Sequence, residues 1–458
     1  MRTNLLIGAL SLTMLAVSAS AQPYEPTWES VDRRETPQWW QDAKFGVFIF
    51  WGVYSVPAYA PTDNENVYVK YAEHYMSRLY RLKTPEFVEH HNKYYGEDFT
   101  YENFASQFDA RFYDADQWAD LFKRSGAKYV VLSSKHHDGY CLWPSKYAPR
   151  WNSTVIGSKR DLLGEFATAM NKAEMDFGFY YSLLEWCHPM YTDSTLNWWV
   201  DQHMHPQMKE LVETYKPKVF YSDGEWDYTS DKLKSADFLA WLYNESPVKD
   251  EVVVNDRWGK DTRGRHGGYY TTEYNLIHDD AAPEYMHPWE ECRGIGGSFG
   301  YNKFEKIEHY SSAEELIHIL IEKVSAGGNL LLDVGPTAEG LIPVIMQERL
   351  LEMGEWLEVN GEAIYSTRRL VHPVKEKTSG IYYTVKGNDL YVLCTEWKEA
   401  IDVNISGMKK PAKVELLGSP LKVGVTNRDG GIRLTAPQVT PNTLPCRHAW
   451  VYKLSDCL

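Results

Sequence analysis

Short, nearly continuous apolar runs alternate with amphipathic stretches through most of this 458-residue chain. The apolar runs predict strands at 44–51, 128–133, 176–183, 218–222, 251–255, 269–273 and 329–334. The amphipathic stretches predict helices at 116–124, 162–172, 208–216 and 313–324. Repeated strand–helix–strand units with apolar strands indicate a parallel sheet that helices cover on both faces. At this length we expect an α/β fold in which the sheet closes into a (β/α)₈-like TIM barrel.

The pattern changes near residue 367. One more helix is predicted at 346–359, and short alternating runs follow at 380–386, 389–395, 401–405, 412–417 and 448–453. Turn residues separate these runs, which is typical of an antiparallel β-sandwich. We therefore predict a catalytic barrel over residues 22–366 and a C-terminal β-sandwich domain over residues 367–458.

The N-terminus has the pattern of a cleaved export signal. Arg2 precedes an apolar run at 5–17, and small residues follow up to Ala21. We predict a signal peptide over residues 1–21 and an exported protein, periplasmic or secreted. No second apolar run reaches the roughly 20 residues of a membrane span, so we expect no membrane anchor. Cys446 and Cys457 either pair in an oxidising compartment or remain free thiols.

Charge and aromatic content narrow the class of partner. The formal net charge is −15, which argues against nucleic acid, because phosphate binding needs a basic surface. Aromatic residues make up 14% of the chain, more than a core requires, and sugar-binding clefts use such rings to stack on C–H faces. These features favour an oligosaccharide or glycoconjugate substrate.

Asp223 ends the apolar run of a predicted strand and precedes Gly224. Barrel enzymes carry their catalytic residues at the C-terminal ends of the strands. A carboxylate there, with Trp226 nearby, suits chemistry on a sugar ring. The alternative is a solvated loop residue that follows a core strand.

Other predicted strands also end in polar groups. His136 and His137 follow one strand, Arg257 follows another, and the segment around Trp289 sets Glu290 beside an aromatic ring. The paired histidines lack a nearby third ligand, so sugar-hydroxyl binding or a structural role is favoured over a metal site, and we expect no metal.

The order of these segments resembles the α-L-fucosidases of glycoside hydrolase family 29. The motifs are KFGVFI at 44–49, WGVYSVP at 51–57, KHHDG at 135–139, DG at 223–224, WE at 289–290, SFGY at 298–301 and GGNLLLDVGP at 327–336. The resemblance implies a (β/α) barrel with a C-terminal β-sandwich. It also implies a retaining exo-hydrolase that removes terminal fucose without a metal or organic cofactor.

The resemblance assigns roles to individual residues. Asp223 matches the nucleophile and Glu290 the general acid/base, with Glu291 left open as a competitor. His136, His137 and Arg257 match sugar-contacting positions, and the adjacent Tyr180 and Tyr181 lie where the family's aromatics approach the site. Substrate contacts are further expected from Trp51, Glu73, Tyr181 and Trp289. The chemistry agrees, because a cation such as Arg257 favours an ionised Asp223, whereas an apolar setting around Glu290 would raise its pKa.

Two positions depart from the family pattern. The strand-one motif commonly has a histidine where this chain has Phe50, and a tryptophan is common where it has His74. His74 either replaces the missing imidazole, or the site is remade for another sugar, or both changes are neutral. We expect both side chains to touch or to line the same pocket as Asp223.

Three functions therefore remain open. The chain is an exported α-L-fucosidase, a relative retargeted to another 6-deoxy or galactose-configured sugar, or a sugar-binding protein without activity. Two catalytic carboxylates argue against the third, because a binding protein gains nothing from burying them.

Overall fold

The computed structural model describes residues 23–274, 287–374 and 378–458. Eight parallel strands form one sheet in the order β5-β4-β3-β2-β1-β8-β7-β6. Their bounds are β1 Phe45–Ile49, β2 Tyr129–Lys135, β3 Asp176–Ser182, β4 Val219–Asp223, β5 Val253–Val254, β6 Tyr270–Glu273, β7 Trp289–Gly294 and β8 Asn329–Val334. The Tyr269 N–H, just before β6, donates to the Val254 carbonyl in β5 at 3.1 Å, so the two edge strands meet and the sheet closes into a barrel.

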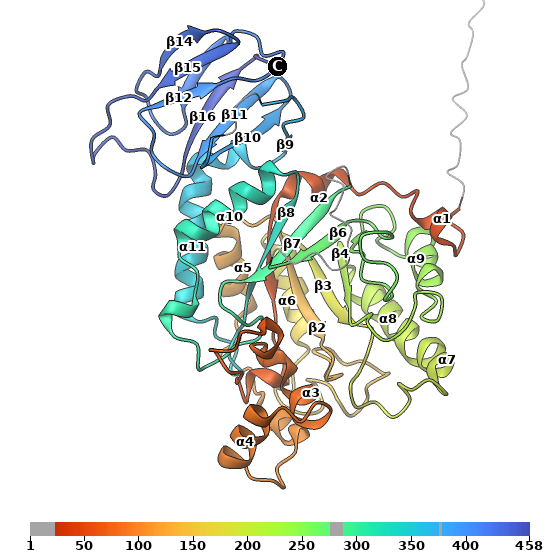
Figure 1. Ribbon diagram of the computed structural model, residues 1–458. Coiled ribbons are helices and arrows are strands. Elements are labelled where there is room, and N and C mark those ends of the chain that lie inside the picture. Colours follow the sequence, from red (N-terminus) through yellow and green to blue (C-terminus); the bar gives the residue numbers. More distant parts are fainter. Residues whose placement is uncertain (1–22, 275–286, 375–377) are drawn as a thin grey trace, which may run out of the picture.

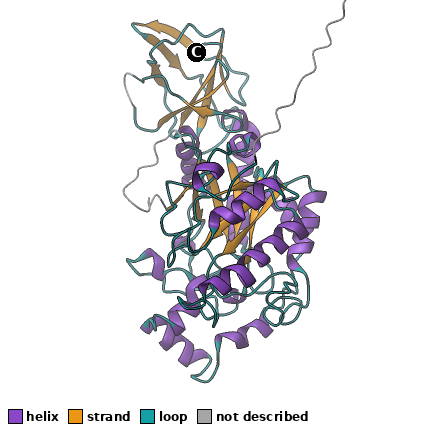
Figure 2. Ribbon diagram, turned by 90° about the vertical axis from the view of Figure 1, so that its right-hand side faces the viewer, coloured by secondary structure: helices purple, strands orange, loops and turns teal. Residues whose placement is uncertain are grey.

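Helices surround the barrel (Figure 2). They are α1 Trp28–Val31, α2 Gln38–Ala43, α5 Ala115–Arg124, α6 Leu162–Lys172, α7 Leu196–Trp198, α8 His205–Tyr215, α9 Ser235–Asn244, α10 Ala313–Ser325 and α11 Val344–Asn360, with a π-helical segment η5 at Trp199–Met204 and short 3₁₀ turns η6 Ile307–His309 and η7 Gly361–Ala363. Alternate residues of each strand face the helices or the barrel interior. In β1, Val47 and Ile49 belong to the helix-facing core, while Phe48 belongs to the interior cluster, which Phe50 extends beyond the strand.

The connection from β1 to β2 is long and forms part of the rim of the barrel. It contains η1 Val53–Ser55, η2 Val67–Val69, η3 Ala72–His74, α3 Tyr75–Tyr80, α4 Pro85–Tyr94 and η4 Tyr101–Gln107. Figure 1 shows α3 and α4 at the end of the molecule farthest from the C-terminal domain. Because this connection leaves the C-terminal end of β1, it lies where a barrel carries its active site.

The C-terminal domain is built from two antiparallel sheets, of order β13-β16-β11-β10-β9 and β12-β15-β14. Their bounds are β9 Arg368–Arg369, β10 Ile381–Lys386, β11 Asp389–Cys394, β12 Ala400–Val403, β13 Lys413–Leu416, β14 Gly424–Arg428, β15 Gly431–Thr435 and β16 Trp450–Ser455. Leu390, Val403 and Leu434 lie in the core that the sheets share, and α10 packs against β10. This confirms the predicted sandwich.

Seven of the eight barrel strands and the helices α5, α6, α8, α10 and α11 follow the sequence prediction. The helices α1, α2, α3, α4, α7 and α9 and the strand β7 have no predicted counterpart. All six cysteines are free thiols, so Cys446 and Cys457 do not pair. The predicted signal peptide lies outside the described residues. Within the described ranges, no helix is both long and apolar enough to cross a membrane.

Candidate active site

The C-terminal ends of the barrel strands open into a cavity of about 530 Å³. Its wall combines aromatic rings with charged groups, which come from the strands β1 to β7 or the loops that follow them and from the β1–β2 connection. The lining residues are Phe48, Phe50, Tyr68, Tyr71, Glu73, His74, Arg78, His136, His137, Tyr180, Tyr221, Asp223, Trp226, Arg257, Arg263, Glu273, Cys292 and Phe299. This composition fits a polar ligand that carries apolar faces.

Asp223 is the last residue of β4 and is 6% exposed. Arg257 donates to its Oδ1 at 2.9 Å, and the Tyr180 hydroxyl donates to its Oδ2 at 2.8 Å. Burial alone would raise the pKa of Asp223, but Arg257, His137 and Arg263 outweigh burial and hold this pKa well below its usual range. The carboxylate is therefore ionised at neutral pH, as a nucleophile must be. Gly224 follows at φ +76°, which lets the chain turn directly after it.

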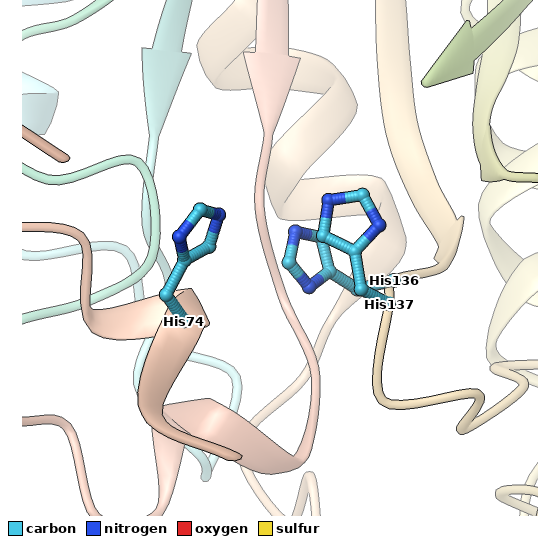
Figure 3. Close-up of side chains that lie close together, drawn as sticks. All are labelled: His74, His136 and His137. Carbon is cyan, nitrogen blue, oxygen red and sulfur yellow. The ribbon is translucent and has the colours of Figure 1, made fainter. Parts of the chain in front are cut away.

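His74 faces His136 and His137 across the cavity (Figure 3). Ring nitrogens of the three lie within 4.8 Å of one another, close enough to hold a metal ion. Both nitrogens of His137 are already engaged, however: Nδ1 lies 2.6 Å from the Ser182 hydroxyl, and Nε2 lies 3.5 Å from Asp223 Oδ2. Coordination would break these contacts, so the trio suits hydroxyl binding better. Burial lowers the pKa of His74 to about 3, and the neutral imidazole offers one donor and one acceptor.

Phe50 lines the same cavity and brings its ring 5.5 Å from His136 and 5.0 Å from Tyr180, centroid to centroid. His74 lies 6.1 Å from His136 by the same measure. Phe50 and His74 thus line one pocket with Asp223, which confirms that part of the prediction. The phenyl ring replaces a hydrogen-bonding surface with an apolar one at this point of the wall.

Two further carboxyl groups reach the cavity. Glu73, in η3, accepts from the Gly300 N–H at 2.8 Å, and burial raises its pKa to about 7 despite this bond. Glu273, the last residue of β6, accepts from the Tyr71 hydroxyl at 2.7 Å and lies 3.3 Å from Arg257 Nη2. Arg257 therefore bridges Asp223 and Glu273 through its two terminal nitrogens.

Glu290 does not reach the cavity, which contradicts its predicted role as acid/base. It is the second residue of β7 and pairs with Asn329, the first residue of β8, near the N-terminal ends of the strands. Its Oε2 accepts a hydrogen bond from Tyr129, the first residue of β2. Cys292, two residues farther along β7, does line the cavity, so Glu290 lies about 6.6 Å deeper along the strand. Glu291 faces the opposite side of the strand, where Thr272 donates to it.

Because Glu290 is buried, we expect the free energy of unfolding to depend on pH through its ionisation. Burial raises its pKa to about 8 from an ordinary value of 4.5, so the folded protein holds the neutral acid. The resulting stabilisation is complete below pH 4.5 and is lost as the pH rises toward 8. Glu290→Gln removes this ionisation. Relative to wild type, we expect the variant to gain up to about 1.4 kcal/mol per pH unit between pH 5 and 8, measured by urea unfolding.

Activity supplies the second readout for this variant. Glu290→Gln should hydrolyse the substrate at close to the wild-type rate, because its side chain lies outside the cavity. A loss of activity comparable to that of a catalytic residue would contradict this assignment of Glu290 to the barrel core.

Three predicted substrate contacts are also wrong, for one shared reason. Trp51, Tyr181 and Trp289 point away from the barrel interior. Trp51 packs against Phe108, Tyr113 and Trp118. The Tyr181 hydroxyl donates to Gln207 at 2.8 Å, and the Trp289 ring lies over Gly328, where a Cβ would come within 2.6 Å of it. The other predicted contacts, His136, His137, Arg257, Glu73, His74 and Phe50, all line the cavity.

Of the two adjacent tyrosines that the resemblance offers, Tyr180 faces the cavity and Tyr181 does not. Several other lining residues were not predicted. Glu273 ends a predicted strand just as Asp223 does, so a sequence signal for it existed. Arg263 binds Glu225 through Nε at 2.5 Å and leaves Nη1 buried without a partner among the described residues. His136 Nδ1 is likewise buried and unpartnered within those residues. Two such orphan groups at one cavity indicate a polar ligand.

Known proteins agree with this architecture. The family model described as "Alpha-L-fucosidase" matches residues 11–362, and the model described as "Alpha-L-fucosidase C-terminal domain" matches residues 375–455. Tissue alpha-L-fucosidase of Homo sapiens is 40% identical over 465 residues, which is 98% of this chain and 97% of the relative. The Bos taurus enzyme is 42% identical over 447 residues, covering 94% and 91%.

Solved structures give the same result. The Thermotoga maritima alpha-fucosidase bound to a mechanism based inhibitor aligns with a TM-score of 0.79 at 38% identity, covering 94% of this chain and 99% of that chain. The structure of the Thermotoga maritima alpha-fucosidase with fucose gives 0.79 at 36% identity, covering 94% and 100%. This chain therefore belongs to the α-L-fucosidases of glycoside hydrolase family 29.

Proposed function

We propose that this glycoside hydrolase removes terminal α-L-fucosyl residues from oligosaccharides or glycoconjugates by double displacement, with Asp223 as the nucleophile. The observation that carries the proposal is an ionised carboxylate at the wall of the cavity, held by Arg257 and Tyr180. Asp223 attacks the anomeric carbon, the glycosidic bond breaks, and a fucosyl ester forms. Water then cleaves the ester and restores the original anomeric configuration.

The second carboxyl group in this mechanism is Glu273. It protonates the departing oxygen in the first step and accepts a proton from water in the second. Retaining glycosidases hold their two carboxyl groups about 5–5.5 Å apart, and one guanidinium, that of Arg257, spans Asp223 and Glu273 here. Glu73 is the second candidate, because its raised pKa of about 7 keeps a proton available near neutral pH.

Two buried polar atoms without a hydrogen-bond partner among the described residues are suited to bind the sugar. His136 Nδ1 and Arg263 Nη1 are buried at the cavity and unpartnered within the described residues, so hydroxyls of a bound sugar satisfy them. Phe50 offers an apolar surface that suits the methyl group or a C–H face of a 6-deoxy sugar. A galactose-configured sugar without that methyl group is the alternative that Phe50 and His74 keep open.

A panel of aryl glycosides followed by NMR tests the reaction and the sugar. We expect hydrolysis of the aryl α-L-fucoside, with α-L-fucose as the first product, and kcat/KM at least about tenfold lower for the galactose-configured analogue. Initial release of β-L-fucose would exclude double displacement. Preference for the galactose-configured substrate would favour the retargeted alternative, and hydrolysis of no substrate would favour a binding protein.

We further propose that the protein is exported. The support is the residue pattern at 1–22, with one basic residue, an apolar run and small residues before Gln22. Intact-mass measurement of the protein from its source would give a chain starting near Gln22. A mass that includes residues 1–21 would contradict export by a cleaved signal.

A further inference from the structure

A second cavity, of about 270 Å³, lies at the end of the barrel opposite the active site. Its wall comes from α2, from the chain at or just before the start of β1, β7 and β8, and from β9 with Val371. Figure 1 shows α2 on the side of the barrel that faces the C-terminal domain. This junction cavity therefore lies between the two domains, and the proposed hydrolysis does not use it.

Cations line the junction cavity. Lys44, Arg368 and Arg369 lie in its wall, and none of the ten described residues that form this wall is Asp or Glu. Asp42 offsets one charge, because it accepts a hydrogen bond from Arg368 Nη2 at 2.8 Å. Gly327 leaves room for the side chain of Arg369, since a Cβ there would lie 3.3 Å from its Cδ. A cavity with this composition favours an anionic ligand.

Lys44 gives the strongest evidence for a ligand. It is 2% exposed, yet within the described residues its ammonium makes no hydrogen bond and no ion pair. Lysine is almost never buried to this extent without a partner, because burial removes the hydration of its charge. Burial, together with repulsion by Arg368, lowers the pKa of Lys44 to about 8, so the ammonium form still predominates at pH 7. An anion in the cavity would supply the missing partner.

The surroundings of Lys44 support a ligand site. Its φ is +63°, a conformation that residues other than glycine rarely adopt, and its carbonyl accepts from the Leu330 N–H at 2.9 Å, which fixes it against β8. Trp40 of α2 also lines the cavity, and its indole N–H is buried without a partner among the described residues. Strained backbone beside unpaired buried donors is more typical of a functional site than of a filled core.

An oxyanion satisfies these groups better than water does. Water in the cavity would solvate Lys44 without neutralising its charge. An oxyanion does both, because ammonium and guanidinium groups donate charge-assisted hydrogen bonds to it. We propose that the junction cavity binds one small oxyanion, phosphate or sulfate, between Lys44 of the barrel and Arg369 of the C-terminal domain. Because the bound anion joins the two domains, it stabilises the folded protein.

Lys44→Met tests the proposal through thermal unfolding. Without an oxyanion we expect the variant to be at least as stable as wild type, because methionine removes a buried charge that lacks a partner. Sodium sulfate at about 10 mM should raise the Tm of wild type by about 2 °C over sodium chloride of equal ionic strength, and it should not raise that of the variant. Lys128→Met is the matched control, because it removes an exposed lysine just before β2, at the same end of the barrel, and should respond like wild type.

Sulfate also stabilises proteins without binding them, because it is excluded from their surfaces, but that effect does not saturate and does not depend on Lys44. A response of equal size in wild type and Lys44→Met, or no saturable response in wild type, would overturn the proposal.

Isothermal titration calorimetry with sodium sulfate measures binding directly. We expect one site per chain, and a Kd at least about tenfold higher in Lys44→Met and in Arg369→Met, since each variant loses a charge-assisted hydrogen bond. Arg369→Met keeps the test decisive if Lys44→Met does not fold. Titration with glucose 6-sulfate separates the two sources of the ligand: binding as tight as that of sulfate would indicate a sulfated glycan, and binding of the inorganic ions alone would indicate a free oxyanion. Unchanged affinity in both variants would place the anion elsewhere and contradict the proposal.

Discussion

Replacement of Asp223 by glycine should lower kcat on an aryl α-L-fucoside by roughly 10⁴-fold. The variant loses the group that forms the fucosyl ester, while Arg257 and Tyr180 still surround the vacated space. Azide ion fits that space and is attracted by the guanidinium. It attacks the anomeric carbon from the same face as the carboxylate, so we expect partial recovery of rate and β-L-fucosyl azide as the product.

The control for this experiment is Asp227→Gly, which removes an exposed carboxylate on the same loop. Asp227 accepts a 3.3 Å hydrogen bond from Tyr191, and we expect near wild-type activity. Fluorescence unfolding of both variants separates lost chemistry from lost folding. If Asp223→Gly kept most of its activity, or if azide gave the α-anomer, the nucleophile would have to be another residue.

The barrel could be predicted because its strands carry their own signal. Asp223 follows Val219, Phe220 and Tyr221, and such an apolar run marks a buried strand whose end is the active-site face. The same reasoning applies to Glu273 at the end of β6. The sequence therefore also indicates Glu273 as a catalytic candidate, because like Asp223 it is a carboxyl residue at the end of a predicted strand.

The errors come from strands whose partners are distant in sequence. β7 reads Trp-Glu-Glu-Cys-Arg-Gly, without an apolar run, because Tyr129 and Thr272 from other strands satisfy its carboxyl groups. The sequence pattern therefore predicts Glu290 near the active-site face, although Glu290 lies near the start of β7. Adjacent positions such as Tyr180 and Tyr181 face opposite sides, and only the register between strands decides which one meets the substrate.

Phe50 and His74 illustrate a third case. They are separated by a connection whose path no periodicity predicts, yet both line the cavity beside His136. Their departure from the family pattern was visible in the sequence. Both side chains lie near His136 because of how the β1–β2 connection folds. Its turn η3 places His74 at the cavity.

Replacement of Glu273 by alanine should lower kcat/KM by an amount that depends on the leaving group of the substrate. Natural fucosides leave as alcohols and need a proton, so kcat/KM on a fucosylated oligosaccharide should fall by about 10²–10⁴-fold. An aryl fucoside with a strongly acidic phenol leaves without protonation, and its first step should change little. Azide should accelerate the variant by attacking the fucosyl ester without general-base help, and it should give α-L-fucosyl azide, the anomer opposite to that from Asp223→Gly.

Glu73→Ala is the decisive comparison, because Glu73 lies in the same cavity and its pKa of about 7 also suits an acid. If Glu273 is the acid/base, Glu73→Ala should slow both classes of substrate alike, since loss of its hydrogen bond to the Gly300 N–H disturbs the wall rather than proton transfer. The reverse pattern, with leaving-group dependence and azide rescue in Glu73→Ala alone, would transfer the role to Glu73. In that case the contact of Arg257 with Glu273 would serve to orient the guanidinium toward Asp223. Glu73, in the β1–β2 connection, would then protonate the leaving group.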